Sequence, residues 1–309
     1  MPTLNANGLK FHVQQAGEGP DAILIHGLTG DLSIWFLCNA MQALGETHRV
    51  TAYDLRGHGY SDVPPAGYTS ADHAADLLAL MDALDIRKAS LVGHSFGAVI
   101  AVHAAVLAPE RVESLVLSDP YFPSLRHLED VSRWGHWEGF RQEALDAGVE
   151  LSDEHWYDLG RFFDQVLHLD GEALLKFRRA VGLPALNRLL KLCRTTCGED
   201  AKAEAGLTSE LITAVEQPVL ALYGEASPFL ATARYLLESL PRCRYALVRG
   251  ARHRAPQENP EEFVRLLTGY LESASDSFED AGGIGLTGMS DQALEGASHP
   301  RPSALETRV

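Results

Sequence analysis

A serine flanked by two glycines has the residue type and spacing of a nucleophile. Ser95 lies in the sequence Gly93-His94-Ser95-Phe96-Gly97, after a short apolar run and before a stretch of small and apolar residues. A serine at such a strand-to-helix turn is exposed at the helix start, where backbone N–H groups favour developing negative charge. Side chains at the two glycine positions would clash with the neighbouring backbone in so tight a turn. The motif predicts that Ser95 attacks an acyl carbon and forms an acyl-serine.

Short apolar runs that end in small or polar residues predict the strands that such a turn needs. Helical spacing separates the earlier runs, as in residues 69–86, where apolar residues recur every three or four positions. Alternating strands and helices imply parallel strands joined by right-handed crossovers, which make a doubly wound α/β sheet. Chemistry in such sheets gathers at the carboxyl ends of the strands. The runs are residues 22–27, 49–54, 89–94, 114–119, 218–224 and 244–248.

The alternation stops in the middle of the chain. Residues 121–215 have helix-like spacing and three of the four tryptophans, and strand-like runs resume only after them. This pattern predicts a helical cap over the active-site face, inserted into a core made of residues 1–120 and 216–272. Residues 273–309 are rich in Ser, Gly, Asp and Pro without an apolar period, which predicts a disordered tail.

Composition and charge restrict the partners and the location. The chain has 309 residues, of which 46% are hydrophobic and 22% charged, as in soluble globular proteins. Its 26 Lys and Arg against 42 Asp and Glu give a net charge of -16, which argues against nucleic acid and anionic membranes as partners. The N-terminus has no basic region followed by an apolar one, and no apolar run approaches the roughly 18 residues of a membrane helix, so a cytoplasmic protein is expected. The four cysteines lack metal-ligand spacing and no dinucleotide-binding glycine motif follows a strand, so neither a metal nor a cofactor is expected.

Three further stretches, together with the serine motif, resemble the α/β-hydrolase fold superfamily. They are the end of an early predicted strand, His26-Gly27-Leu28; residues 54–62, DLRGHGYSD; and residues 250–267, GARHRAPQENPEEFVRLL. The resemblance implies an α/β-hydrolase sheet, mostly parallel, with the helical cap inserted after its sixth strand.

The same resemblance implies roles for individual residues. The backbone N–H groups of Leu28 and Phe96 would form an oxyanion hole, in which each donor is worth about 3 kcal/mol. His253, in the loop after the last predicted strand, would be the base, late in the chain as this fold requires. His26 would hold its own turn, and residues 54–62 would be scaffold beneath the active site.

The carboxylate that should stand behind His253 is missing from the position where the resemblance most often places it. In the common pattern an aspartate lies three residues after the strand glycine, but here Ser227 follows Gly224 at that spacing. A second layout of the superfamily puts the acid after the preceding strand, where this chain has Asp119. Asp119 is therefore the first choice for the acid. Glu225, interpreted as loop chemistry, is an alternative, and a serine-histidine pair without an acid is another.

The serine nucleophile also restricts the reaction. Haloalkane dehalogenases and epoxide hydrolases of this superfamily use aspartate, so Ser95 argues against both. The expected function is a cofactor-independent serine esterase or thioesterase that acts on a small apolar acyl substrate, free or carrier-bound, in a pocket that includes Trp35 and Phe229. The alternatives on the same fold are an acyltransferase, a C–C bond hydrolase or a cyclase of a biosynthetic intermediate, and a non-catalytic ligand-binding pseudoenzyme.

Overall fold

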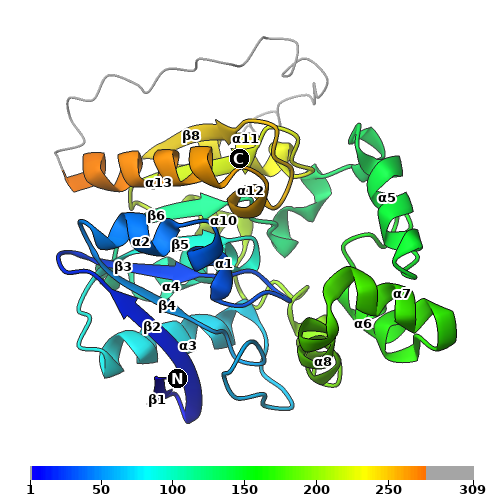
Figure 1. Cartoon of the computed structure of the whole chain (residues 1–309). Helices are drawn as coiled ribbons and strands as arrows, with labels where there is room; N and C mark the ends of the chain where they lie inside the picture. The colour runs from blue at the N-terminus through cyan, green and yellow to red at the C-terminus, as the bar shows by residue number, and fades with distance from the viewer. Residues whose placement is uncertain (1, 276–309) are drawn as a thin grey trace, which may run out of the picture. The chain divides into compact units, whose positions relative to one another are not determined.

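The apolar runs of the sequence form the central strands of one sheet. In the computed structural model, which describes residues 2–275, the sheet has eight strands in the order β1-β2-β4-β3-β5-β6-β7-β8 (Figure 1). The strands are β1 (Thr3–Ala6), β2 (Leu9–Ala16), β3 (Asp21–Ile25), β4 (Arg49–Tyr53), β5 (Ala89–His94), β6 (Val112–Ser118), β7 (Val219–Gly224) and β8 (Cys243–Val248).

Strand direction divides the sheet into two parts. Strands β3 to β8 are the predicted apolar runs, and they pair in parallel. Strands β1 and β2 pair antiparallel at one edge and were not among those runs. Their side chains are only partly buried, as β1 shows with one buried residue in four, so they lack the continuous apolar signal of a strand covered on both faces. The predicted mostly parallel α/β sheet is confirmed.

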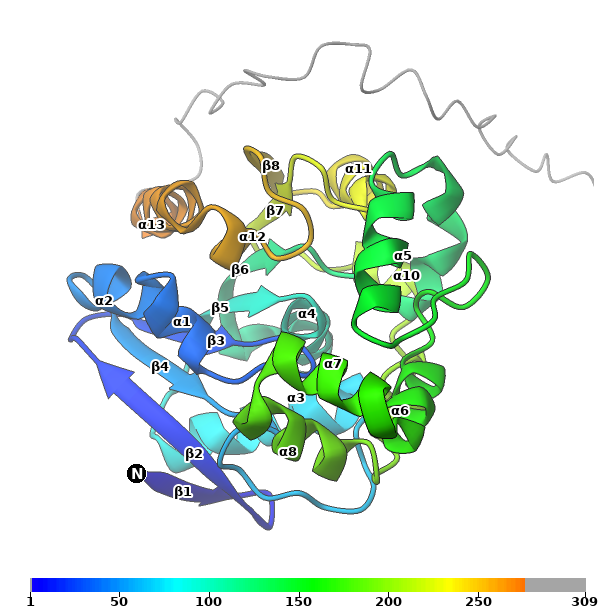
Figure 2. The same ribbon diagram turned by 45° about the vertical axis from the view of Figure 1, so that its right-hand side comes forward.

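Helices cover both faces of the sheet, and the side chains of the strands alternate between them. On β3, Ile23 and Ile25 belong to the core cluster that includes α3 and α4, whereas Leu24 belongs to the cluster that includes α1, α2 and α13. Figures 1 and 2 show these two helix layers. The helices are α1 (Ser33–Leu37), α2 (Ala40–Gly45), α3 (Ser70–Ala83), α4 (Phe96–Leu107) and α13 (Pro260–Ser275), with η1 (Pro109–Arg111), α11 (Leu230–Ser239) and α12 (Ala255–Glu258) in the connections.

The stretch between β6 and β7 is helical, as predicted, and we call residues 121–215 the helical segment. This stretch is described throughout and contains no strand. Figure 2 shows its helices α5 to α8 gathered on one side of the sheet. Its elements are η2 (Pro123–Leu128), η3 (Val131–Arg133), α5 (Trp137–Asp146), α6 (Leu159–His168), α7 (Gly171–Val181), α8 (Leu183–Leu192), α9 (Cys197–Asp200) and α10 (Ser209–Thr213).

The helical segment contacts loops that follow the carboxyl ends of parallel strands. The Arg188 guanidinium on α8 pairs with the Asp31 carboxylate after β3 at 3.0 Å. The Trp134 indole N–H donates to the carbonyl oxygen of Ala226 after β7 at 2.8 Å. In a parallel sheet these ends lie at one edge, which is where active sites form. The segment therefore packs against the edge that carries the candidate site.

The sequence predicts a core, a cap and a tail with separate boundaries, whereas the structure shows fewer divisions. Residues up to Leu271 form one compact unit, so a core of 1–120 and 216–272 with a separate cap domain of 121–215 stays a prediction. The disordered tail was predicted for residues 273–309. Residues 273–275 instead form the end of α13, so the predicted boundary was too early, and the rest of the predicted tail lies outside the described residues. Within residues 2–275, no helix combines the length and the apolar character needed to cross a bilayer.

Candidate active site

Ser95 sits on a strained turn between β5 and α4. Its backbone has φ 54° and ψ -121°, a region that residues other than glycine rarely adopt. A side chain at Gly93 would overlap the carbonyl oxygen of Gly97, and one at Gly97 would overlap the carbonyl oxygen of Ile25 on β3. The two glycines thus let the turn pack against its own helix and the neighbouring strand. The strand-turn-helix context on which the nucleophile prediction depends is present.

The structure brings His253 to Ser95 from the far end of the sequence. His253 lies between β8 and α12, and its Nε2 is 3.0 Å from the Ser95 Oγ. Its side chain is 34% exposed. The ring of Phe229 meets the imidazole edge to face, with 5.1 Å between the ring centroids. One nitrogen of the imidazole thus faces the hydroxyl, as a general base for Ser95 requires.

Asp119 lies behind His253 and is fully buried. It directly follows β6, with a positive φ of 52°, and its Oδ1 is 3.5 Å from the His253 Nδ1. That separation is long for a hydrogen bond, and His253 Nδ1 has no hydrogen-bond partner among residues 2–275. Such contacts are often loose before substrate binds. Burial raises the pKa of the Asp119 carboxyl, and its contacts with His253, Ser227 and Gly224 oppose that rise.

The loop after β7 holds the other two residues considered for the acid position. Glu225 is exposed, and its Oε2 accepts the N–H of Gly250 at 2.9 Å. Ser227 is buried, and its hydroxyl donates to Asp119 Oδ1. Of the sequence candidates, Asp119 is therefore the carboxylate that the structure places against His253, and Glu225 is engaged elsewhere.

The two residues expected to form an oxyanion hole lie beside Ser95. Phe96 is the first residue of α4. Leu28 follows Gly27, at which an added Cβ would lie 3.0 Å from the Ser95 Cβ. Leu28 packs against core clusters of both the sheet and the helical segment. Among residues 2–275, neither backbone N–H donates to a backbone carbonyl in the turns and loops.

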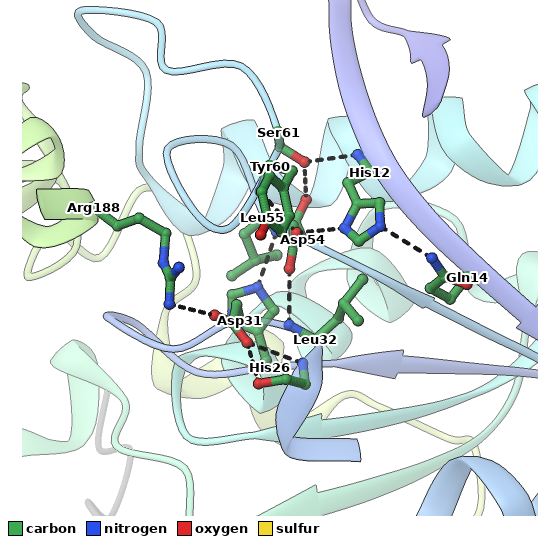
Figure 3. A network of polar contacts seen from close by, with 11 residues as sticks. His12, Gln14, His26, Asp31, Leu32, Asp54, Leu55, Tyr60, Ser61 and Arg188 are labelled. Atoms are coloured by element: carbon green, nitrogen blue, oxygen red, sulfur yellow. Dashed lines mark hydrogen bonds and ion pairs between the residues drawn. The ribbon is translucent and has the colours of Figure 1, made fainter. Parts of the chain in front are cut away.

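His26 is held by backbone groups on both sides of its ring, and Figure 3 shows the one on the side of Leu55. Its Nε2 accepts the N–H of Leu55 at 3.0 Å, so the proton is on Nδ1, which donates to the carbonyl oxygen of Gly27 at 2.8 Å. Burial lowers the pKa of this imidazole. Both contacts fix the turn that carries Leu28, which is the structural role expected for His26.

Asp54 organises the loop of residues 54–62. Its carboxylate accepts the N–H of Leu32 at 2.8 Å and the N–H of Tyr60 at 2.9 Å, and contacts the His12 Nδ1 at 2.8 Å (Figure 3). A side chain at Gly59 would overlap this carboxylate. The aspartate ties β2, the loop after β3 and the loop after β4 together, so the structure supports a scaffold role for this motif.

The two side chains expected to line the pocket have different surroundings. Phe229 lies against His253, as described above. Trp35 instead is fully buried in the core; its ring centroid is 6.5 Å from that of Phe263 on α13. The short helix α1 turns the indole toward α13, so Trp35 is a core residue and not a wall of the pocket. The sequence showed that Trp35 was near the His26 turn but not which way it pointed.

A run of aromatic contacts leads from His253 into the helical segment. The Trp156 ring stacks on Phe229 at a centroid distance of 5.5 Å. Trp156 also lines a mostly apolar cavity of about 240 Å³, whose walls include Phe140, Tyr157, Phe162 and Phe177. The sequence marked Trp156 only as one of three tryptophans in the predicted cap, because no local pattern says which of them faces the site.

His94 is a further residue at the site to which the sequence gave no role. Its ring centroid is 5.3 Å from that of His253, and its Nδ1 is 3.2 Å from the Ser118 Oγ. Burial, and next the proximity of His253, hold the pKa of His94 well below its usual value. The available signal was its place in the elbow motif, immediately before Ser95.

No group of three or more His, Cys, Asp or Glu side chains within residues 2–275 is placed to hold a metal ion. The four cysteines are free thiols.

The chain is similar in sequence and in fold to several known proteins. Residues 23–255 match the family model described as alpha/beta hydrolase fold. The chain is 28% identical to 2-(acetamidomethylene)succinate hydrolase of Mesorhizobium japonicum over 280 residues, which are 86% of this chain and 92% of the relative. It is 37% identical to Epoxide hydrolase 3 of Siraitia grosvenorii over 128 residues, 39% of each chain. The enol-lactonase from Burkholderia xenovorans LB400 has the same fold, with a TM-score of 0.63, 24% identity and coverage of 88% of this chain and 100% of that one.

Proposed function

Because this chain belongs to the α/β-hydrolase fold family, we propose that it is a cofactor-independent serine hydrolase of carboxylic esters or thioesters. The observation that carries the proposal is the 3.0 Å approach of His253 Nε2 to Ser95 Oγ. The buried Asp119 carboxylate on the other side of the imidazole supports it. Similarity to relatives named as hydrolases supports the reaction class.

The proposed reaction has two acyl-transfer steps. His253 Nε2 removes the hydroxyl proton as Ser95 Oγ attacks the carbonyl carbon, and the imidazolium then gives that proton to the leaving alcohol or thiol. A water molecule, deprotonated by the same imidazole, then attacks the acyl-serine; the C–O bond to Ser95 breaks, the acid is released, and the imidazolium returns its proton to Ser95 Oγ. Asp119 keeps the proton of the resting imidazole on Nδ1 and stabilises the imidazolium formed in each step.

Backbone groups would stabilise the negative charge that develops on the carbonyl oxygen. The proposed donors are the N–H groups of Leu28 and Phe96. Helix α4, whose twelve residues begin at Phe96, would add the positive end of its dipole at the same place. Removing one such donor typically costs about 3 kcal/mol of transition-state stabilisation. Ser95 as nucleophile argues against epoxide opening, the reaction in the name of one relative, because that reaction uses a carboxylate nucleophile.

The surroundings support an apolar acyl group. The cavity in the helical segment measures about 240 Å³, which exceeds the roughly 150 Å³ apolar cavity that accommodates benzene. Its wall residue Trp156 stacks on Phe229, and Phe229 contacts His253. An aryl or short alkyl acyl chain would therefore find apolar surface from the reacting centre into the helical segment. We propose a small-molecule or carrier-bound acyl substrate of this kind.

Covalent labelling tests the nucleophile directly. A fluorophosphonate probe is expected to label the wild-type protein at Ser95, identified by peptide mass, and not to label Ser95→Ala or heat-denatured protein. Ser95→Ala should also lose ester hydrolysis almost completely, because loss of a nucleophilic serine costs about 10⁶ in kcat. No labelling of folded protein, while a control serine hydrolase reacts, would contradict the proposal.

A substrate series then tests the acyl group and the bond. Hydrolysis of p-nitrophenyl esters with acetyl, hexanoyl and benzoyl groups is compared with hydrolysis of the matching thioesters. We expect kcat/KM to rise from acetyl to the larger groups, and Trp156→Ala to reduce that preference. A preference for acetyl in the wild-type protein would contradict the proposed apolar acyl group without affecting the nucleophile.

A further inference from the structure

We propose that Ser227 is a positioning residue of this site, whose hydroxyl holds Asp119 Oδ1 toward the Nδ1 of His253. The inference rests on the proposed function for its catalytic consequence, but the contact itself is tested separately below. In the sequence, Ser227 stands where the common pattern of the superfamily has the catalytic aspartate. In the structure it supplies a hydrogen-bond donor to the carboxylate that lies one strand away.

Two donors, one at the end of β7 and one in the loop after it, fix both oxygens of Asp119. The N–H of Gly224 donates to Oδ2 at 2.7 Å, and the hydroxyl of Ser227 donates to Oδ1. The N–H of Ser227 in turn donates to the carbonyl oxygen of Gly224 at 3.0 Å. That turn brings both donors to one carboxylate. With one donor on each oxygen, the carboxylate cannot rotate about its Cβ–Cγ bond without losing a hydrogen bond.

The direction of the Ser227 hydroxyl proton is also fixed. The N–H of Phe229 donates to the Ser227 Oγ at 3.0 Å, which occupies one acceptor site of the oxygen. Ser227 is only 3% exposed, so the proton has little access to solvent and points to Asp119. Phe229 itself contacts His253. A single short loop therefore orders the acid and one wall around the base.

The hydroxyl also acts on the charge of Asp119. The carboxylate is fully buried, and burial favours its neutral form, whereas the bond from Ser227 favours the ionised form. The other titratable groups that act electrostatically on or with Asp119 are His253, Glu129, Tyr223 and Tyr245. All of these remain when Ser227 is replaced, so a change in the titration of the site reports the loss of the hydroxyl.

The test is the variant Ser227→Ala, measured over pH with a p-nitrophenyl ester. Loss of a hydrogen bond to a charged group should lower kcat/KM about tenfold to a hundredfold, mainly in kcat, because ground-state substrate contacts do not change. In this variant the ionised Asp119 carboxylate has one hydrogen-bond donor fewer, so the Asp119-His253 pair should hold a proton more tightly. The acid limb of the profile, which reports that proton, therefore moves to higher pH.

The matched control is Ser114→Ala. Ser114 is also buried on β6 and donates to the Ser90 Oγ at 2.9 Å, so this variant loses a buried hydroxyl bond in a different part of the sheet. It should lose similar stability in urea denaturation but keep the wild-type pH profile. Equal profiles for Ser227→Ala and the wild-type protein would overturn the proposal.

A readout independent of turnover separates this inference from the proposed function. In protein with ¹³C-labelled aspartate, the carboxyl signal absent from Asp119→Asn identifies Asp119. Its titration midpoint should move to higher pH in Ser227→Ala and stay unchanged in Ser114→Ala. An unchanged midpoint in Ser227→Ala overturns the inference, whereas failure of fluorophosphonate labelling overturns the proposed hydrolase and leaves this measurement decisive for the contact.

Discussion

Two His-Asp contacts in this molecule join the same atoms, a carboxylate oxygen and the histidine Nδ1, but their surroundings differ. Asp54 follows the parallel strand β4 and contacts His12 at 2.8 Å, while Asp119 follows the parallel strand β6 and contacts His253 at 3.5 Å. Both aspartates are buried. The His12 side chain is 6% exposed, however, whereas that of His253 is 34% exposed. The shorter and more buried contact is the one without access to a substrate.

The second nitrogen of each imidazole explains the difference. His12 Nε2 accepts from the Gln14 amide at 3.1 Å, so both of its nitrogens are used within the scaffold. His253 Nε2 faces the Ser95 hydroxyl, which lies at a strained turn and at a helix start. A base needs a partner that can give up a proton, and Gln14 cannot serve as one. What marks a candidate catalytic pair is therefore the group beyond the histidine, more than the quality of the His-Asp contact.

Of the substitutions that test this comparison, replacing Asp119 should have the largest effect, a loss of turnover. Asp119→Asn should lower kcat about 10⁴-fold, because an amide can neither fix the tautomer of His253 nor stabilise its imidazolium. The fold should survive, since Asn fills the same volume. Steady-state kinetics and circular dichroism of the same preparation measure both. Activity within a few-fold of the wild-type value would exclude Asp119 as the acid and reopen the case of a serine-histidine pair.

The corresponding change in the scaffold should have the opposite outcome. Asp54→Asn places an amide among the N–H donors of Leu32 and Tyr60, so at least one buried hydrogen bond to a charged group is lost. We expect the free energy of unfolding to fall by about 3 kcal/mol. Urea denaturation measures this loss. Turnover per labelled active site should stay within a few-fold of wild type; a stable Asp54→Asn variant with strongly reduced turnover would show that the two pairs do not divide the roles as described.

The comparison also shows which parts of the site a sequence can predict. Ser95, His253 and the glycines at 93 and 97 were predictable because a strained turn and a fixed place in the chain order demand particular residue types at particular spacings. The helical segment was predictable because apolar periodicity changes from strand-like to helix-like over many residues.

Other features depend on side-chain direction, which local spacing does not encode. Trp35 points into the core because α1 packs toward α13, and Trp156 faces Phe229 because the helical segment folds back over the strand ends. The role of Ser227 depends on two loops from adjacent strands, separated by more than a hundred residues. Only their pairing in the sheet brings that hydroxyl to Asp119.

The smallest expected effect concerns acid pH and again involves the scaffold region. Burial, and next the proximity of His26, lower the pKa of His58 to about 3, against about 6.5 in an unfolded chain. Near about pH 6 and below, His58 therefore binds a proton in the unfolded state but stays neutral in the folded state. The stability that its neutral form provides at neutral pH is lost as pH falls below about 6.5. From pH 7.5 to pH 5.5, His58 alone should reduce the free energy of unfolding by about 1.4 kcal/mol.

His58→Gln isolates this contribution, because the variant can keep both hydrogen bonds without titrating. His58 Nε2 accepts the N–H of Thr29 at 3.1 Å, and Nδ1 donates to the carbonyl oxygen of Arg56 at 2.8 Å; a glutamine amide offers one acceptor and one donor to the same groups. Urea denaturation at both pH values should show a loss on acidification that is smaller in the variant by about 1.4 kcal/mol. An identical loss in both proteins would mean that His58 takes up no extra proton on unfolding. The acid sensitivity of the fold would then lie outside the scaffold contact that links Thr29, beside the candidate oxyanion hole, to the loop of residues 54–62.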